Sequence, residues 1–272
     1  MNDREERFRR VLKELKALDL SLYPSDEIIS LFKQLDNLPV LITTLLPGRR
    51  IIRGRSYNEG EDFSLIDYHS YRPKEMNDEY QRASIPKQTM FYGAVTSGEQ
   101  EEPVARVTIL TEIGKTMNQD AEYEKVMFSA WEVIEDINLI SVMQCQFYQS
   151  PNKMMQTLEK RFNDELKYDY EREFWNFIAT EFAKKNTSLD YDYIISAYFS
   201  TMACNACDGV YYPSVRIDGA GMNVAIKPEV IDSKLRFLGA VDCDVVRTGM
   251  DIQVLEKRKS IFKLEYIPIV NE

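Results

Sequence analysis

A block of helical sequence between two groups of strand-like segments constrains the fold of this chain more than any other feature. Residues 151 to 205 contain three stretches with apolar residues at helical spacing, among them Trp175, Phe177, Ile178 and Phe182. Runs rich in valine, isoleucine and aromatic residues precede and follow this block, and turn residues bound them. Because the strands do not alternate singly with helices, the sequence predicts an α+β fold and not a doubly wound α/β fold.

The predicted strands fall into two sets. Those before the helical block are expected at residues 49–56, 89–95, 104–113, 125–133 and 137–145. Those after it are expected at residues 209–216, 222–228, 234–248, 251–258 and 263–270. A long polar stretch at 61–88 separates the first two strands and is predicted to be a loop, and long loops in compact domains are often functional.

The first 48 residues are predicted to be a helical extension. Apolar residues recur at helical spacing up to Leu18, and a second helix is expected from Pro24 to Leu35. Residues 49–272 then form the main domain, with the helical block inserted between its strands. The two N-terminal helices either cover one side of the core or make a contact with a second copy or another protein.

The charge balance and hydropathy limit the classes of partner. The chain carries a net charge of −10, which argues against recognition of a nucleic-acid backbone. One basic stretch, RRIIRGR at 49–55, is suited to a small phosphorylated ligand. No apolar run reaches the length of a membrane-spanning helix, and the charged N-terminus does not resemble a signal peptide. The expectation is a cytoplasmic protein that does not bind membranes.

Histidine and cysteine chemistry is poorly supported. His69 is the single histidine of the chain and lies in a polar stretch without an evident orienting partner, so a Ser-His-Asp or Cys-His mechanism is not expected. Cys204 and Cys207 form a C-x-x-C pair, but a zinc site needs four ligands and no second pair exists. The two thiols are predicted to pack near the end of a helix, and no metal is expected.

Four polar residues stand out from otherwise apolar or irregular surroundings: Arg82 in the polar loop, Tyr92 on the following strand, Glu112 at the end of a predicted strand, and Ser214 after Pro213. Each also has an ordinary explanation. Arg82 is explained as a solvated loop charge and Tyr92 as a core aromatic. Glu112 is explained as the point where a strand reaches water, and Ser214 as the cap of a bend. Their order along the chain is the stronger signal.

In that order the chain resembles the RES-domain family, named for its arginine, glutamate and serine. The resemblance spans about residues 49–248, and its most specific parts are YYPSVR followed by GMNVAI, with the ten-residue step from Arg82 to Tyr92. The loop around Arg82 departs from the family pattern, because it lacks the usual glycine and asparagine. The positions that match the family motifs are Arg53, Arg82, Tyr92, Glu112, Ser214 and Asn223.

The resemblance implies a fold similar to ADP-ribosyltransferases and cleavage of the nicotinamide–ribose bond of NAD+. It implies a toxin held in check by a helix-turn-helix antitoxin, with NAD+ as substrate. In this scheme Glu112 stabilises the oxocarbenium-like ribose, Arg82 and Arg53 bind the pyrophosphate, and Tyr92 stacks on a ring.

Ser214 would form a hydrogen bond at the ribose or amide, with Asn223 behind it. The acceptor, whether water, phosphate or a protein side chain, stays open. Two alternatives also stay open: a catalytically degenerate nucleotide-binding or interaction module, and an ADP-ribosyltransferase that acts on a protein. A homodimer is also consistent with the sequence.

Overall fold

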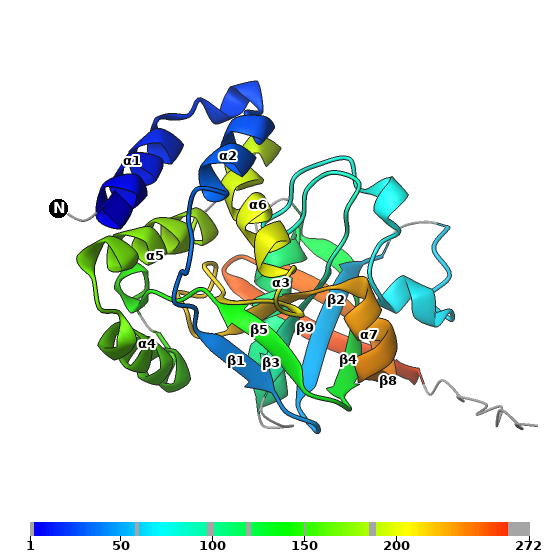
Figure 1. Cartoon of the computed structure of the whole chain (residues 1–272). Coiled ribbons are helices and arrows are strands. Elements are labelled where there is room, and N and C mark those ends of the chain that lie inside the picture. Colours follow the sequence, from blue (N-terminus) through cyan, green and yellow to red (C-terminus); the bar gives the residue numbers. More distant parts are fainter. Residues whose placement is uncertain are drawn as a thin grey trace, which may run out of the picture.

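The structure is a computed structural model that describes residues 3–57, 60–96, 101–117, 121–149, 151–184 and 189–260. Its centre is one nine-stranded sheet with the order β1-β5-β6-β7-β3-β2-β4-β8-β9. Neighbouring strands are antiparallel except for the parallel pair β5 and β6. Helices lie around this sheet, which makes the protein a mixed α+β structure, as the sequence predicts (Figure 1).

The strands and helices have the following bounds. The strands are β1 (Ile42–Leu45), β2 (Arg50–Ser56), β3 (Phe91–Thr96), β4 (Tyr123–Val133), β5 (Ile137–Ser141), β6 (Gly209–Pro213), β7 (Met222–Ile226), β8 (Leu235–Thr248) and β9 (Asp251–Ser260). The α-helices are α1 (Asp3–Ala17), α2 (Ser25–Phe32), α3 (Glu102–Ile113), α4 (Lys153–Glu165), α5 (Asp169–Phe182), α6 (Ile194–Ala203) and α7 (Pro228–Lys234).

Most predicted elements are present, and the helical block is confirmed as α4, α5 and α6. The strand predicted at 209–216 ends earlier, at Pro213, and the chain turns over residues 215–219. The strand predicted at 263–270 lies outside the described residues.

One predicted strand is wrong, because residues 104–113 form most of helix α3. Valine, isoleucine and threonine favour strands, but this preference is weak and tertiary packing overrides it. Pro103 lies in the first turn of α3, where the lack of an N–H costs nothing. The buried residues Ala105, Thr108 and Ile109 follow helical and not alternating spacing.

Two glycines allow α3 to lie directly on the sheet. A Cβ at Gly54, on β2, would overlap the Ile109 side chain, and a Cβ at Gly221 would overlap the hydroxyl of Thr108. Both contacts are with the inner face of α3, so the missing side chains set how closely the helix approaches. This packing fixes the position of the last turn of α3.

The N-terminal helices pack on the inserted helices. α1 contacts α5, α2 contacts α6, and their apolar residues share one buried cluster with Phe174 and Phe182. The segment 1–48 is not helical throughout, since it also supplies β1 at one edge of the sheet. Figure 1 shows α1, α2, α5 and α6 gathered to one side of the strands.

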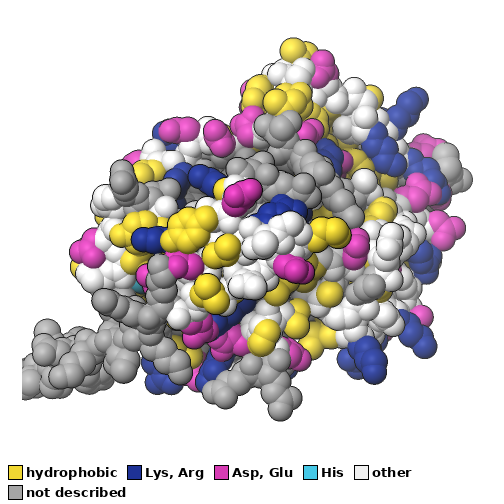
Figure 2. Space-filling model, turned by 180° about the vertical axis from the view of Figure 1, so that it is seen from behind, with side chains coloured by type: hydrophobic (Ala, Val, Ile, Leu, Met, Phe, Trp, Pro, Cys, Tyr) yellow, Lys and Arg dark blue, Asp and Glu magenta, His cyan; other side chains and the backbone are white. Residues whose placement is uncertain are grey.

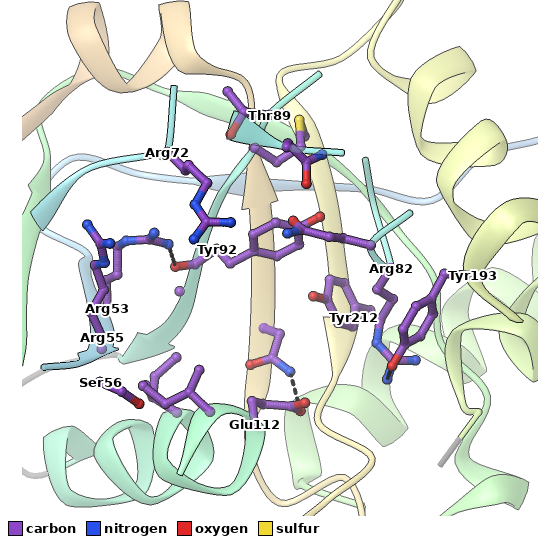
Figure 3. Close-up of a pocket in the computed structure, with 18 residues that line it drawn as sticks. Arg53, Arg55, Ser56, Arg72, Arg82, Thr89, Tyr92, Glu112, Tyr193 and Tyr212 are labelled. Carbon is purple, nitrogen blue, oxygen red and sulfur yellow. Dashed lines mark hydrogen bonds between the residues drawn. The ribbon is translucent and has the colours of Figure 1, made fainter. Parts of the chain in front are cut away.

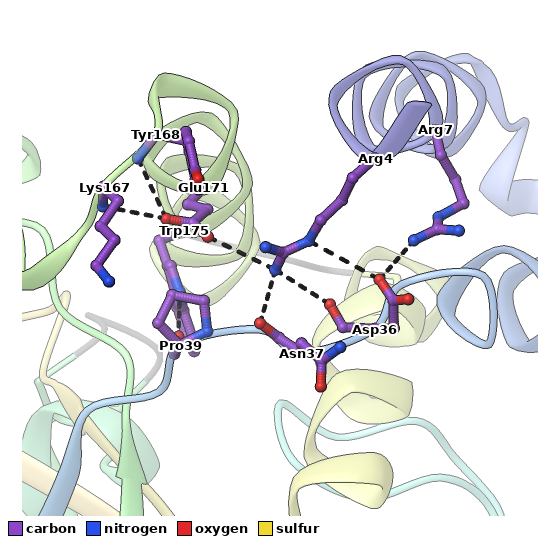
Figure 4. A network of polar contacts seen from close by, with 9 residues as sticks. All are labelled: Arg4, Arg7, Asp36, Asn37, Pro39, Lys167, Tyr168, Glu171 and Trp175. Atoms are coloured by element: carbon purple, nitrogen blue, oxygen red, sulfur yellow. Dashed lines mark hydrogen bonds and ion pairs between the residues drawn. The ribbon is translucent and has the colours of Figure 1, made fainter. Parts of the chain in front are cut away.

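A polar network fastens this arrangement (Figure 4). Arg4 donates hydrogen bonds to the main-chain oxygens of Asp36 and Asn37, at 3.3 and 2.7 Å, and lies 3.6 Å from the Glu171 carboxylate. The indole N–H of Trp175 donates to the main-chain oxygen of Pro39 at 2.9 Å. The chain that leaves α2 is therefore tied to both α1 and α5.

The surface carries charges of both signs. Figure 2 shows Lys and Arg side chains interspersed with Asp and Glu on the face opposite that of Figure 1. No helix among the described residues has the length and apolar character needed to cross a membrane.

Candidate functional site

A pocket of about 440 Å³ opens where the sheet, the last turn of α3 and the polar loop meet. Strands β2, β3, β6 and β7 form its floor, and Tyr193, just before α6, closes one side. Figure 3 shows the side chains that line it. Five of the six residues predicted for the site line this pocket, namely Arg53, Arg82, Tyr92, Glu112 and Asn223.

Glu112 is the only carboxylate among the described residues that line this pocket, and two donors hold it. Its Oε1 accepts a hydrogen bond from Ser214 Oγ at 3.0 Å and another from Asn223 Nδ2 at 3.1 Å. Within the described part of the chain, Oε2 has no hydrogen-bond partner. One oxygen is therefore oriented by the protein, while the other is available to a ligand.

Ser214, the sixth predicted residue, lies behind Glu112 and is fully buried. It directly follows Pro213, and its main-chain N–H donates to the Gly221 oxygen at 2.8 Å. Its hydroxyl is thereby directed at Glu112. Ser214 thus orients the carboxylate and does not line the pocket.

Three arginines gather on one side of the pocket (Figure 3). Arg53 and Arg55 come from β2, and Arg72 comes from the polar loop. Arg55 forms an ion pair with Glu61 at 2.7 Å. No carboxylate among the described residues forms an ion pair with Arg53 or Arg72, so this side of the pocket carries excess positive charge.

Arg53 is the most unusual of these cations. One terminal nitrogen donates to the main-chain oxygen of Tyr92 at 2.8 Å, and the guanidinium lies 5.2 Å from the centre of the Phe91 ring. Its Nε is buried and has no hydrogen-bond partner among the described residues. Burial, followed by the nearby charge of Arg55, lowers the pKa of Arg53 to about 10. A half-buried guanidinium at the wall of a pocket is suited to an anionic ligand.

Arg82 lies on the opposite side of the pocket, and its guanidinium is already engaged. It donates to the main-chain oxygens of Phe182 and Lys184, at the C-terminal end of α5, and lies 5.0 Å from the centre of the Tyr193 ring. The cation therefore satisfies carbonyls that the helix leaves unpaired. This arrangement ties the polar loop to the inserted helices.

Tyr92 connects the pocket to the same loop. Its hydroxyl accepts a hydrogen bond from the Ala83 main-chain N–H at 3.2 Å and lies 3.0 Å from Ser84 Oγ. Burial raises the pKa of Tyr92 to about 12, so the phenol is neutral at physiological pH. The ten-residue step between Arg82 and Tyr92 therefore has a structural basis: the tyrosine holds the loop that carries the arginine.

Among the polar and aromatic residues that line the pocket, sequence reasoning did not assign Arg72, Tyr193 or Tyr212 to the site, while Arg55 belongs to the basic stretch at 49–55 that it singled out. Tyr212 is buried on β6 and pairs in register with Asn223 on β7. Burial raises the pKa of Tyr212 well above its ordinary value. Its place in YYPSVR, two residues before Ser214, was an available signal. No sequence signal pointed to Arg72, because only the folding of the polar loop brings it to the pocket.

The cysteines lie as predicted. Cys204 and Cys207 directly follow α6 as free thiols, and Cys207 is buried. In the ranges that the structure covers, no group of three or more His, Cys, Asp or Glu side chains is arranged to hold a metal ion.

No protein-family model matches the chain, and no curated protein matches it. The function must therefore be argued from the geometry of the site.

The pocket combines an oriented carboxylate, an arginine cluster and tyrosine rings. A carboxylate can stabilise a developing positive charge, and arginines bind phosphate through paired N–H donors. Aromatic rings provide stacking surfaces for heterocycles. The arrangement is therefore suited to a phosphorylated ligand that becomes cationic near Glu112.

Proposed function

We propose that this protein cleaves the nicotinamide–ribose bond of NAD+ and is a RES-like enzyme with an ADP-ribosyltransferase-like core. The observation that carries the proposal is Glu112, which Ser214 and Asn223 orient at one end of a pocket. The other wall holds Arg53 and Arg72, neither of which has a carboxylate partner among the described residues. The residue order that resembles the RES family and the spatial grouping of the same residues support it independently.

The chemistry needs little beyond these groups. The bond between ribose C1′ and the pyridinium nitrogen breaks, and its electron pair leaves with neutral nicotinamide. The ribose then carries positive charge in an oxocarbenium-like state, which the Glu112 carboxylate stabilises. Water adds at C1′ and releases a proton, giving ADP-ribose. With inorganic phosphate as acceptor, a phosphate oxygen adds at C1′ in place of water and the product is ADP-ribose phosphorylated at that carbon.

The other residues bind and position. Arg53 and Arg72 neutralise the pyrophosphate, because neither has a carboxylate partner among the described residues. The rings of Tyr92 and Tyr212 give faces for the nicotinamide ring or the ribose. Arg82 acts indirectly, since its N–H groups are used by main-chain oxygens at the end of α5.

The test is nicotinamide release from NAD+ by the purified chain, measured by chromatography with and without inorganic phosphate. Glu112→Gln keeps an acceptor oxygen for Ser214 and Asn223 but removes the charge. We expect it to lose activity by about 10²-fold or more, as loss of an electrostatic stabiliser typically does. Glu102→Gln is the matched control on the same helix, where Glu102 pairs with Arg106 away from the pocket, and it should retain activity.

The products separate this proposal from its alternatives. Binding of NAD+ without nicotinamide release would identify a nucleotide-binding module. Label from NAD+ appearing on protein would identify a protein-modifying transferase. In cells, the proposal includes a toxin whose expression depletes NAD+ and which an antitoxin neutralises. Growth and NAD+ levels unaffected by the wild-type chain would contradict it.

A further inference from the structure

The second half of the polar loop supplies one wall of the pocket. Gln81 and Arg82 line the pocket from this segment. Tyr92 holds the segment from the pocket side, because its hydroxyl accepts a hydrogen bond from the Ala83 main-chain N–H at 3.2 Å. Tyr80 directly precedes the wall, and its contacts are with segments far away in the sequence. These distant segments therefore help to place the wall.

Asp190 is the point at which three segments of the chain meet. It begins the 3-10 helix Asp190–Tyr193, which leads into α6. Its Oδ2 accepts a hydrogen bond from the Tyr80 main-chain N–H at 3.3 Å, and its Oδ1 accepts one from the Tyr23 hydroxyl at 2.7 Å. Hydrogen bonds to an ionised acceptor are stronger than those between neutral groups. One half-buried carboxylate thus joins the polar loop, the N-terminal extension and the inserted helices.

Tyrosine rings pack around this junction. The ring centre of Tyr80 lies 6.0 Å from that of Tyr23 and 6.1 Å from that of Tyr198. The Tyr80 hydroxyl lies 3.0 Å from Ser25 Oγ, at the start of α2. Tyr23 has a left-handed backbone with φ of 54°, which is uncommon for an aromatic residue. Such a conformation persists where surrounding contacts hold it, so the junction specifies one arrangement of its segments.

The same 3-10 helix also contacts Arg82. The guanidinium of Arg82 lies 5.0 Å from the centre of the Tyr193 ring, at the end of the helix that Asp190 begins (Figure 3). The two ends of this helix therefore hold Tyr80 and Arg82, with Gln81 between them. A segment held on both sides loses most of its conformational freedom.

We propose that Asp190 is a positioning residue, which sets the affinity of the pocket for its ligand by holding Tyr80 and, through it, Gln81 and Arg82. The identity of the ligand as NAD+ rests on the proposed function, whereas the ordering of the loop does not. Because Asp190 also binds the Tyr23 hydroxyl, the N-terminal extension takes part in this control.

The effect falls on binding and not on bond cleavage. Glu112 lies on α3, while its donors Ser214 and Asn223 lie directly after β6 and on β7, so elements other than the loop orient the carboxylate. Loss of Asp190 should loosen one wall of the pocket and leave Glu112 oriented. A change that weakens binding of the ground state and of the transition state alike raises KM and leaves kcat unchanged.

The first experiment measures nicotinamide release by variants of the full chain. Asp190→Ala should raise the KM for NAD+ about fivefold and leave kcat within about twofold of wild type. Tyr23→Phe keeps the ring and removes the hydroxyl, so it should raise the KM about twofold. Adding Tyr23→Phe to Asp190→Ala should change nothing further, because the hydroxyl then has no carboxylate to hold. Asp36→Asn is the matched control, since Asp36 pairs with Arg7 within the N-terminal extension, and it should behave as wild type.

The second experiment needs no substrate. Amide hydrogen exchange of the ligand-free chain is followed by mass spectrometry on peptides that cover residues 78–86. Asp190→Ala should speed exchange in this segment about tenfold and leave β8 unchanged, because the loop then opens locally while the sheet stays intact. Thermal unfolding establishes that each variant is folded. If Asp190→Ala does not fold, Asp190→Asn, which keeps one acceptor oxygen, takes its place in both experiments.

Each outcome decides one of the two proposals. Unchanged exchange at residues 78–86 in the Asp190 variant would overturn the positioning role. A fall in kcat at unchanged KM would overturn it as well, and so would losses that multiply when Tyr23→Phe is added. If exchange rises as expected while the wild type releases no nicotinamide, the positioning of the loop stands and the proposed cleavage fails.

Discussion

The contact between Asn223 and Glu112 gives the sharpest test of the site, through the substitution Asn223→Asp. In the wild type, Asn223 Nδ2 donates to Glu112 Oε1 over 3.1 Å. The substitution replaces this donor with a second carboxylate at nearly the same distance. Two ionised carboxylates so close repel by about 5 kcal/mol at an effective dielectric constant of about 20. One of the two must then hold a proton in the folded state.

The sign of the pH dependence follows from this shared proton. The folded pKa of the pair lies above that of the same carboxyls in the unfolded chain. Near pH 5 the protonated carboxyl donates to the other, and stability should be close to wild type. As pH rises toward the folded pKa, the unfolded chain releases a proton that the native state retains. The variant should therefore lose about 1.4 kcal/mol per pH unit, reaching a deficit of about 4 kcal/mol at pH 8.

The assay is urea unfolding of wild type, Asn223→Asp and Asn223→Ala between pH 5 and pH 8, followed by circular dichroism. Asn223→Ala loses one hydrogen bond to a charged group, so its deficit should be about 2 kcal/mol and change little with pH. A constant deficit in Asn223→Asp over this range would refute the reasoning. It would mean that the carboxylate of Glu112 does not lie against position 223.

Three further outcomes follow from the fold and the pocket. Gly54→Ala should cost about 1–3 kcal/mol of stability, because the added Cβ overpacks against Ile109. Adding Ile109→Ala to the same chain should recover part of this loss. If urea unfolding shows that the two losses simply add, α3 does not approach the sheet this closely. Burial lowers the pKa of His69, the single histidine, so the unfolded chain binds its proton more readily. Stability should therefore fall as pH drops through about 6.5, the ordinary pKa of histidine, and a His69→Gln profile that keeps the same slope there would argue against this assignment. Arg82→Met should lower stability by about 2 kcal/mol and change the KM for NAD+ less than Arg53→Met does; the reverse order, measured by unfolding and by nicotinamide release, would make Arg82 the phosphate ligand.

The fold class could be predicted from the sequence because the periodicity of apolar residues is a local property of the chain. Helical spacing identified α4, α5 and α6, and short β-branched runs identified most strands. The same approach failed at residues 104–113, which are rich in strand-forming residues yet form α3. There the deciding interaction is with residues far along the chain, since Gly54 and Gly221 leave room for a helix on the sheet.

The candidate site shows the same division. Conspicuous polar residues, read in their order, gave Glu112 and Ser214, and the family resemblance added Asn223. Sequence order alone did not predict that Ser214 and Asn223 hydrogen-bond the same carboxylate oxygen. Nor did it predict that carbonyls at the end of α5 use the guanidinium of Arg82.

The sequence by itself therefore determined most of the helices and strands, but not β1, α3 or α7, and it showed which polar residues are conspicuous. Only the tertiary structure decided what those residues face. Arg72 lines the pocket and Ser214 lies buried behind Glu112, because of how the polar loop and α3 pack on the sheet. Hydrogen bonds and charge interactions act over a few ångströms in space and not along the chain, so roles in the pocket depend on contacts between distant segments.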